Sequence, residues 1–247
     1  SSPSYANQKN YSELEKAALK ESNLVKLGKN SEAIKSLEEK LLANPDNPYL
    51  YHLLGRAYKN LKQLSVSENY FQQALRIDPN YEKPYIGLAL LKGKQGNLKS
   101  SVELLNKAIE INPKYAKAYS NRGVAKGTLS DNLGAIEDFN KAIEYDPLLS
   151  DAYRNRGITN ELIGNLKGAC KDWKTAYSLG QNQAKDWYLK QCNELKEFKN
   201  NDQEDLILAL QKTNLRLSNQ IAESKKANAN KSSILKEISI GQPFKNI

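Results

Sequence analysis

The chain has 247 residues, of which 39% are hydrophobic and 26% are charged, and its mean hydropathy is −0.70. No apolar stretch approaches the roughly 18 residues that a membrane-spanning helix needs, and none resembles a signal-peptide core. The net charge is +9, and basic residues exceed acidic ones both before and after residue 183. This distribution predicts a mildly basic surface rather than the single basic stripe typical of nucleic-acid binders.

The first 13 residues are polar, and we expect them to be flexible. After them, prolines recur every 34 residues, at Pro45, Pro79, Pro113 and Pro147, in the phrases ANPDN, IDPNY, INPKY and YDPLL. Proline stops a helix because it lacks an N–H and clashes with the preceding turn. Thirty-four residues is the length of a helix–turn–helix repeat. The predicted units are 14–47, 48–81, 82–115, 116–149 and 150–183.

Small and large residues recur at matching positions of these units. The small residues of the first helix are Gly55, Ala89, Gly123 and Gly157. The large residues of the second helix are Leu37, Phe71, Leu105, Phe139 and Trp173. The glycines expected at the turn between the two helices, where a left-handed residue is favoured, are Gly28, Gly96 and Gly164. Small residues let two helices approach closely, and the large side chain fills the space beside the crossing.

The proline spacing and these markers together resemble the tetratricopeptide-repeat (TPR) family. The resemblance implies an all-α fold: a right-handed solenoid of five helix–turn–helix repeats with a C-terminal capping helix. The first unit departs from the family markers at Ala17, Lys20, Glu21 and Lys40, as terminal repeats often do because one face meets solvent. The phrases SNRGVAKG and GAIEDFNKAIEYDP are similar to TPR proteins of cyanobacteria and plastids, some of which help to assemble photosystems.

TPR proteins bind partners in a concave groove lined by the first helices of successive repeats. The family's groove positions, transferred residue by residue, give Tyr49, His52, Arg56, Lys59, Lys83, Ile86, Lys94, Lys117, Asn121, Arg154 and Asn155. This wall is polar and mainly basic, which favours an acidic protein or peptide held by charge-assisted bonds. Ordinary solvated surface is the alternative for any single position. The carboxylate clamp of chaperone-binding relatives is matched only at Lys117 and Asn121, so we do not expect a chaperone's C-terminal tail to bind.

Residues 184–200 carry an apolar stripe at helical spacing and are expected to form the capping helix, with Trp187 in the core. Cys170 and Cys192 are the only cysteines, too few for the usual structural zinc site. The family often packs the two helices that carry them against each other. Two alternatives follow: a disulfide that pins the cap, in an oxidising compartment, or a pair of buried free thiols.

Residues 201–247 leave the repeat and are predicted to form an amphipathic helix and a flexible tail. Ile207, Leu210, Asn214, Leu217 and Ile221 have coiled-coil spacing, but over barely two heptads. We therefore expect a short helix that docks on another surface, with weak dimerisation through residues 204–224 as the alternative. The stretch ESKKANANKSS is typical of a linker, and the apolar residues after it could anchor in a groove.

The sequence contains no motif for catalysis. It lacks a phosphate-binding loop, a nucleophile elbow and an HExxH pair, and His52 is its only histidine. We therefore expect no enzymatic activity, no cofactor and no metal. The predicted function is a protein–protein interaction scaffold, as in an assembly factor for a larger photosynthetic complex. One alternative is an RNA-binding solenoid, but the 34-residue period disfavours it, so no nucleic acid is expected. The other alternative is a module whose C-terminal tail fills its own groove.

The sequence leaves the compartment open. The chain has no methionine and begins at Ser1. A mature protein freed of a targeting segment has this form, and so has a shortened chain. We therefore expect a soluble protein that is either cytoplasmic or exported to the periplasm or thylakoid lumen.

Overall fold

The computed structural model describes residues 11–192, and every regular element in that range is an α-helix. The all-α prediction is therefore confirmed over the described residues. The predicted end of the capping helix, the coiled-coil segment, the linker and the tail lie outside them. None of the described helices is long and apolar enough to cross a membrane.

The described helices are a short first helix, five pairs and a last single helix. Unit one comprises α1 (Tyr11–Ala17), α2 (Leu19–Lys26) and α3 (Asn30–Ala43). Units two and three comprise α4 (Pro48–Asn60), α5 (Leu64–Ile77), α6 (Glu82–Lys94) and α7 (Leu98–Ile111). Units four and five comprise α8 (Ala116–Thr128), α9 (Asn132–Tyr145), α10 (Ser150–Leu162) and α11 (Leu166–Ser178), and α12 (Asn182–Cys192) follows.

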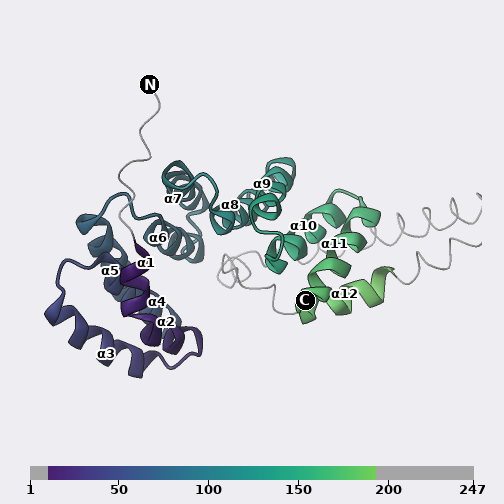
Figure 1. Cartoon of the computed structure of the whole chain (residues 1–247). Coiled ribbons are helices and arrows are strands. Elements are labelled where there is room, and N and C mark those ends of the chain that lie inside the picture. Colours follow the sequence, from purple (N-terminus) through teal and green to yellow (C-terminus); the bar gives the residue numbers. More distant parts are fainter. Residues whose placement is uncertain (1–10, 193–247) are drawn as a thin grey trace, which may run out of the picture.

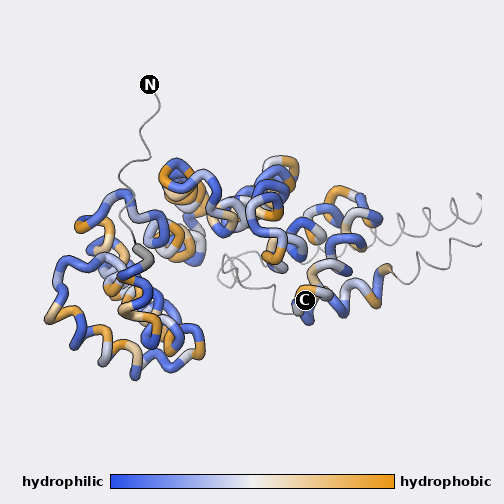
Figure 2. Tube along the Cα trace, in the orientation of Figure 1, coloured by the Kyte–Doolittle hydropathy of each residue, from blue (hydrophilic) through white to orange (hydrophobic). Residues whose placement is uncertain are grey.

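The units stack side by side along an open arc (Figure 1). Successive first helices contact one another, α2 with α4, α4 with α6, α6 with α8 and α8 with α10. Their contact places them along one side of the arc, which we call the inner face. Hydrophobic residues are interspersed with polar ones along the helices (Figure 2), as expected when each helix buries only one side. The helical solenoid predicted from the sequence is confirmed.

The predicted stops and turns fall where the repeat requires them. α3, α5, α7 and α9 each end two residues before the proline of their unit. Gly28, Gly96 and Gly164 adopt positive φ angles of 77°, 80° and 82° at the turn between paired helices. The same position in units two and four holds Lys62 and Ser130, with φ of 61° and 69°. Because side chains other than glycine disfavour this conformation, these two turns are locally strained.

Close approach of the paired helices depends on the small residues. A Cβ atom placed on Gly55 would lie 2.6 Å from the ring of Phe71, and one placed on Gly87 would lie 2.5 Å from it. The ring of Phe71 is therefore wedged between helices of adjacent units. Gly123 faces Phe139 in the same way, at 2.8 Å. The packing of small residue against large ring follows the predicted pattern.

Unit one achieves the same packing with different chemistry. Glu21 is 1% exposed and accepts hydrogen bonds from Lys40 at 2.9 Å and from Ser36 at 2.7 Å. Burial raises the pKa of Glu21, but the bonds from Lys40 and Ser36 outweigh it and leave that pKa lowered. An ion pair thus occupies the place of two small residues. Helix α1 begins at Tyr11, within the segment 1–13 that was expected to be flexible.

The C-terminal cap is fastened to the last repeat. Cys170 on α11 and Cys192 on α12 form a disulfide, with 5.7 Å between their Cα atoms. Of the two alternatives for these cysteines, the structure contains the bonded one. Trp187 packs against the core around Trp173, with 5.9 Å between ring centroids. The cap therefore covers the apolar side of unit five.

Candidate partner-binding groove

Two neighbouring hollows lie on the inner face, with volumes of about 610 and 590 Å³. We call the first the amide hollow, because Asn30, Asn60, Asn121 and Asn155 are among its lining residues. We call the second the aromatic hollow, because its lining includes Tyr49, His52, Phe71 and Tyr115. The two hollows share the residues Lys26, Lys59, Leu90 and Lys117. They therefore form one continuous groove, with lysines at its centre.

The structure brings all eleven predicted groove residues to this surface. Those in the aromatic hollow are Tyr49, His52, Arg56, Lys59, Lys83, Ile86 and Lys117. Those in the amide hollow are Lys59, Lys94, Lys117, Asn121, Arg154 and Asn155. Their placement matches the transferred pattern, whereas partner binding by them stays a prediction.

Several lining residues were missed by the sequence reasoning. Lys26 and Asn30 belong to unit one, to which the groove positions were not transferred. Lys62 lies at the turn after α4, and Tyr115 and Leu149 precede α8 and α10. A consistent reading of unit one in the same register could have found Lys26. The turn residues have no counterpart among the family's groove positions.

The groove concentrates positive charge. Nine lysine or arginine side chains line it, against the two carboxylates of Glu15 and Asp151. The sequence predicted a mildly basic surface, and this groove is a strongly basic part of it. The basic residues recur at intervals along the sequence, but the repeat directs them to the same face. The lining cations are Lys16, Lys26, Arg56, Lys59, Lys62, Lys83, Lys94, Lys117 and Arg154.

Most of these cations have no acidic partner. Glu15 pairs with Lys83, and Asp151 lies 3.5 Å from Arg154. Lys16 pairs with Glu13, which stands outside the groove lining. Among the described residues, the other six cations have no carboxylate within 4.0 Å. The groove therefore holds uncompensated positive charge that an anionic ligand would neutralise.

Crowding of these cations shifts their proton equilibria. Burial, together with the charges of Lys94 and Arg56, lowers the pKa of Lys59 to about 8. Burial and the charge of Lys62 also lower the pKa of Lys94. Both shifts have the direction expected when a charged amine loses water and faces like charges. An incoming carboxylate would offset the like-charge repulsion and favour the charged form of both lysines.

His52 forms a neutral wall of the aromatic hollow. Burial, followed by the charges of Arg56, Lys83 and Lys59, lowers its pKa well below the ordinary value. Its ring lies 5.6 Å from that of Tyr81 and 5.7 Å from that of Phe71. Within residues 11–192, Nδ1 of His52 is buried without a hydrogen-bond partner. His52 therefore contributes an apolar surface and one unused polar atom, and it adds no charge at neutral pH.

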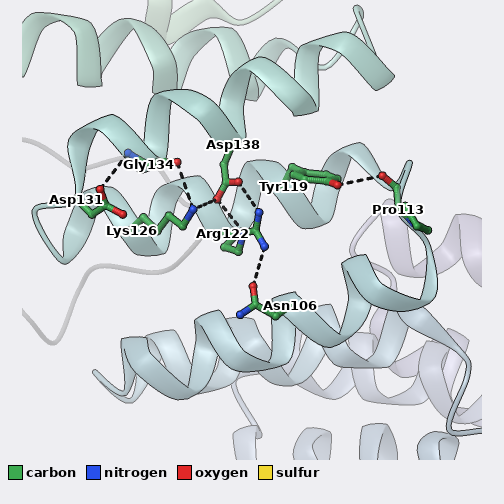
Figure 3. Close-up of polar contacts among 8 residues, drawn as sticks. All are labelled: Asn106, Pro113, Tyr119, Arg122, Lys126, Asp131, Gly134 and Asp138. Atoms are coloured by element: carbon green, nitrogen blue, oxygen red, sulfur yellow. Dashed lines mark hydrogen bonds and ion pairs between the residues drawn. The ribbon is translucent and has the colours of Figure 1, made fainter.

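A second set of arginines is fully engaged in the fold. Arg122 donates from Nε and Nη2 to the two oxygens of Asp138, at 2.8 and 2.6 Å, and from Nη1 to Asn106 of the preceding unit at 2.7 Å (Figure 3). Lys126 adds a 3.0 Å ion pair to the same carboxylate. One unit later, Arg156 repeats the arrangement with Asp172. The arginine of the NRG phrase thus joins adjacent repeats and does not line the groove.

Models of known protein families match three segments of the chain. Residues 94–130 match a model described as TPR repeat, and residues 48–81 and 116–147 match one described as tetratricopeptide repeat. These matches confirm that the chain contains tetratricopeptide repeats. No curated protein matches the chain significantly in sequence.

Solved structures share the fold. A thermophilic TPR protein from Thermus thermophilus is 19% identical with a TM-score of 0.63, and the match covers 72% of this chain and 98% of that one. MamA from Desulfovibrio magneticus RS-1 is 20% identical with a TM-score of 0.53, over 72% and 99%. Another MamA structure is 24% identical with a TM-score of 0.52, over 67% and 96%. At these identities the likeness concerns the fold alone.

Proposed function

We propose that this chain of tetratricopeptide repeats is a non-catalytic scaffold that holds an acidic segment of a partner protein in its groove. Proteins built from such repeats are generally protein-interaction scaffolds. The observation that carries the proposal is the surplus of groove cations, nine against two carboxylates. An acidic segment would neutralise charges that the fold itself leaves unpaired.

The chemistry of the two hollows favours a polypeptide. The amide side chains of Asn60, Asn121 and Asn155 can donate to and accept from a peptide backbone. Leu19, which is 56% exposed, and the half-buried Leu90 offer apolar area for side chains. A segment that alternates acidic and apolar residues would therefore use both hollows, with its carboxylates at the central lysines.

RNA is a weaker candidate for the same cations. Single-stranded nucleic acid is held by stacking of its bases on exposed aromatic rings. In the aromatic hollow, however, Tyr49 is 6% exposed and His52 is 7% exposed, because both pack into the core. Phe71 is fully buried as well, and only Tyr115 is half-buried, so the groove offers little ring area to bases and suits carboxylates better.

The wider role is part of the same proposal. The resemblance of residues 116–180 to cyanobacterial and plastid TPR proteins supports an assembly factor for a larger photosynthetic complex. The alternative in which the C-terminal tail fills the groove concerns residues outside the described range and stays a prediction. Removing residues 201–247 and measuring ligand affinity tests it, since an unchanged affinity would exclude the tail as a groove ligand.

The experiment that tests the scaffold function is affinity capture with paired charge reversals. A Lys59→Glu, Lys117→Glu variant places two acids at the centre of the groove. A Lys35→Glu, Lys167→Glu variant makes the same change in net charge at exposed positions on α3 and α11. Partners are captured after nuclease treatment and identified by mass spectrometry.

The expected result is a protein retained by the native chain and by the α3/α11 variant but lost by the groove variant. Equal capture by both variants would refute binding in the groove. Loss of every captured protein on nuclease treatment would favour the RNA alternative instead.

A further inference from the structure

The start of unit one is bent so that α1 leans over the groove. Ala18 interrupts the helix with φ of −120° and ψ of 26°, and it is buried at 1% exposure. Leu14 of α1 packs on the apolar core that includes Leu50 and Leu53 of α4. α1 contacts both α2 and α4. Its position is therefore fixed by packing, and the side chain that follows Leu14 is carried to the edge of the aromatic hollow.

That side chain, Glu15, forms an ion pair with Lys83 of α6, 68 residues away in sequence. Glu15, Tyr49 and Lys83 occupy the same position in units one, two and three, so the pair skips one repeat. The ammonium group of Lys83 also lies 5.8 Å from the ring centroid of Tyr49. All three residues line the aromatic hollow. The pair thus spans the groove at its N-terminal end.

Glu15 is the one carboxylate of the aromatic hollow, where six cations converge. It is 38% exposed and Lys83 is 28% exposed. An ion pair that open to water contributes at most about 1 kcal/mol, so it can be exchanged. Arg56 and Lys59 in the same hollow have no carboxylate partner among the described residues. An incoming segment with several carboxylates would satisfy these cations as well as Lys83, whereas Glu15 satisfies only one.

We propose that Glu15 is an internal stand-in for the partner, and that an acidic segment binds by replacing Glu15 at Lys83. This inference rests on the proposed function and adds its selectivity. A ligand with a single carboxylate gains little, because it exchanges one ion pair for another. A ligand with several carboxylates gains the unpaired cations.

The test uses the full chain and a rhodamine-labelled synthetic peptide rich in glutamate and leucine, with the glutamine version of that peptide as its control. A carbodiimide joins ion-paired carboxyl and amine groups as an amide, with loss of water. In the free chain it is expected to link Glu15 to Lys83 in the groove and Glu110 to Lys107 outside it. Saturating acidic peptide should abolish the first link and leave the second unchanged, as read by peptide mass spectrometry.

Matched variants give an independent readout. Glu15→Gln removes the competing charge and should tighten binding of the acidic peptide by roughly two- to fivefold, the equivalent of an exposed ion pair. Glu110→Gln removes a carboxylate that is 69% exposed and pairs with Lys107, which lies outside both hollows, so it should leave the affinity unchanged.

The possible outcomes separate the two proposals. A Glu15–Lys83 link that persists while the peptide is bound overturns the exchange but not the groove function, and so does equal affinity of the two glutamine variants. Failure of the acidic peptide to bind better than its glutamine version overturns the proposed acidic ligand, and the exchange with it.

Discussion

We expect Lys59 to lower the stability of the fold and to raise the affinity for an acidic ligand, and replacing it tests both effects. Lys59 lies where the two hollows meet, and burial with the neighbouring Lys94 and Arg56 lowers its pKa to about 8. An unfolded lysine titrates near 10.4. Because the pKa is lower in the folded chain, charged Lys59 destabilises the fold below about pH 8. That cost disappears as the pH rises from about 8 to about 10.4.

The change in binding follows from the same value. At about pH 7 roughly nine in ten free chains carry a charged Lys59, and at about pH 9 roughly one in ten does. A bound carboxylate favours the charged form, so binding at high pH must take up a proton. The dissociation constant for the acidic peptide should therefore rise about tenfold across this interval, equivalent to about 1.4 kcal/mol. Lys94, whose pKa is also lowered, acts in the same direction.

Fluorescence anisotropy of the rhodamine-labelled peptide measures this dependence, and chemical denaturation measures stability. Lys59→Met should weaken binding at about pH 7, flatten the pH dependence, and stabilise the chain by about 1 kcal/mol. Lys167→Met, an exposed change on α11, should alter none of these. The reasoning is refuted if the native chain binds equally well across the interval, or if Lys59→Met retains its full pH dependence.

Three further predictions concern the fold, each read by chemical denaturation. Gly123→Leu should destabilise unit four by about 1–3 kcal/mol, because a Cβ there would lie 2.8 Å from a buried ring; an unchanged curve would contradict the packing. Ser130→Gly should stabilise by about 0.5–1 kcal/mol, since φ is 69°; a loss would contradict strain at this turn. Arg156→Leu should lower the free energy of unfolding by about 3 kcal/mol, and Arg122→Leu should lower it less. The reason is that, among the described residues, Asp172 would keep only the neutral amide donor of Asn160, whereas Asp138 would keep its ion pair with Lys126. Equal losses would contradict that difference.

The sequence was sufficient for the repeat because the relevant signals are local and periodic. A proline two residues after each second helix and a glycine at the turn act on the backbone directly, wherever the unit lies. Lys62 and Ser130 show the limit of that reasoning, because neither lysine nor serine predicts a residue in the left-handed conformation. Their conformation is imposed by the helices on either side.

What escaped prediction depends on pairs that are distant in sequence. Glu21 violates the rule of a small residue at its position, and only the approach of Lys40 explains how it is accommodated. The bend at Ala18 has no residue signal, yet it decides that Glu15 meets Lys83 two units away. The concentration of positive charge in the groove was not predicted for a related reason. Composition gives the number of charged residues, whereas the electrostatic potential depends on which of them lie on the same face.

The contrast between the two kinds of cation in this chain is the strongest argument for a ligand. Arg122 and Arg156 each face a carboxylate that is buried at 3% exposure, and they join one repeat to the next. Their charge is accounted for by the fold. Lys59, Lys94 and Arg56 in the groove have no acidic partner among the described residues, and Lys94 and Arg56 repel the charge of Lys59. Residues that destabilise the fold and make no compensating structural contact are typical of functional sites. The unpaired cations of the inner face therefore support the proposal that it binds a negatively charged segment.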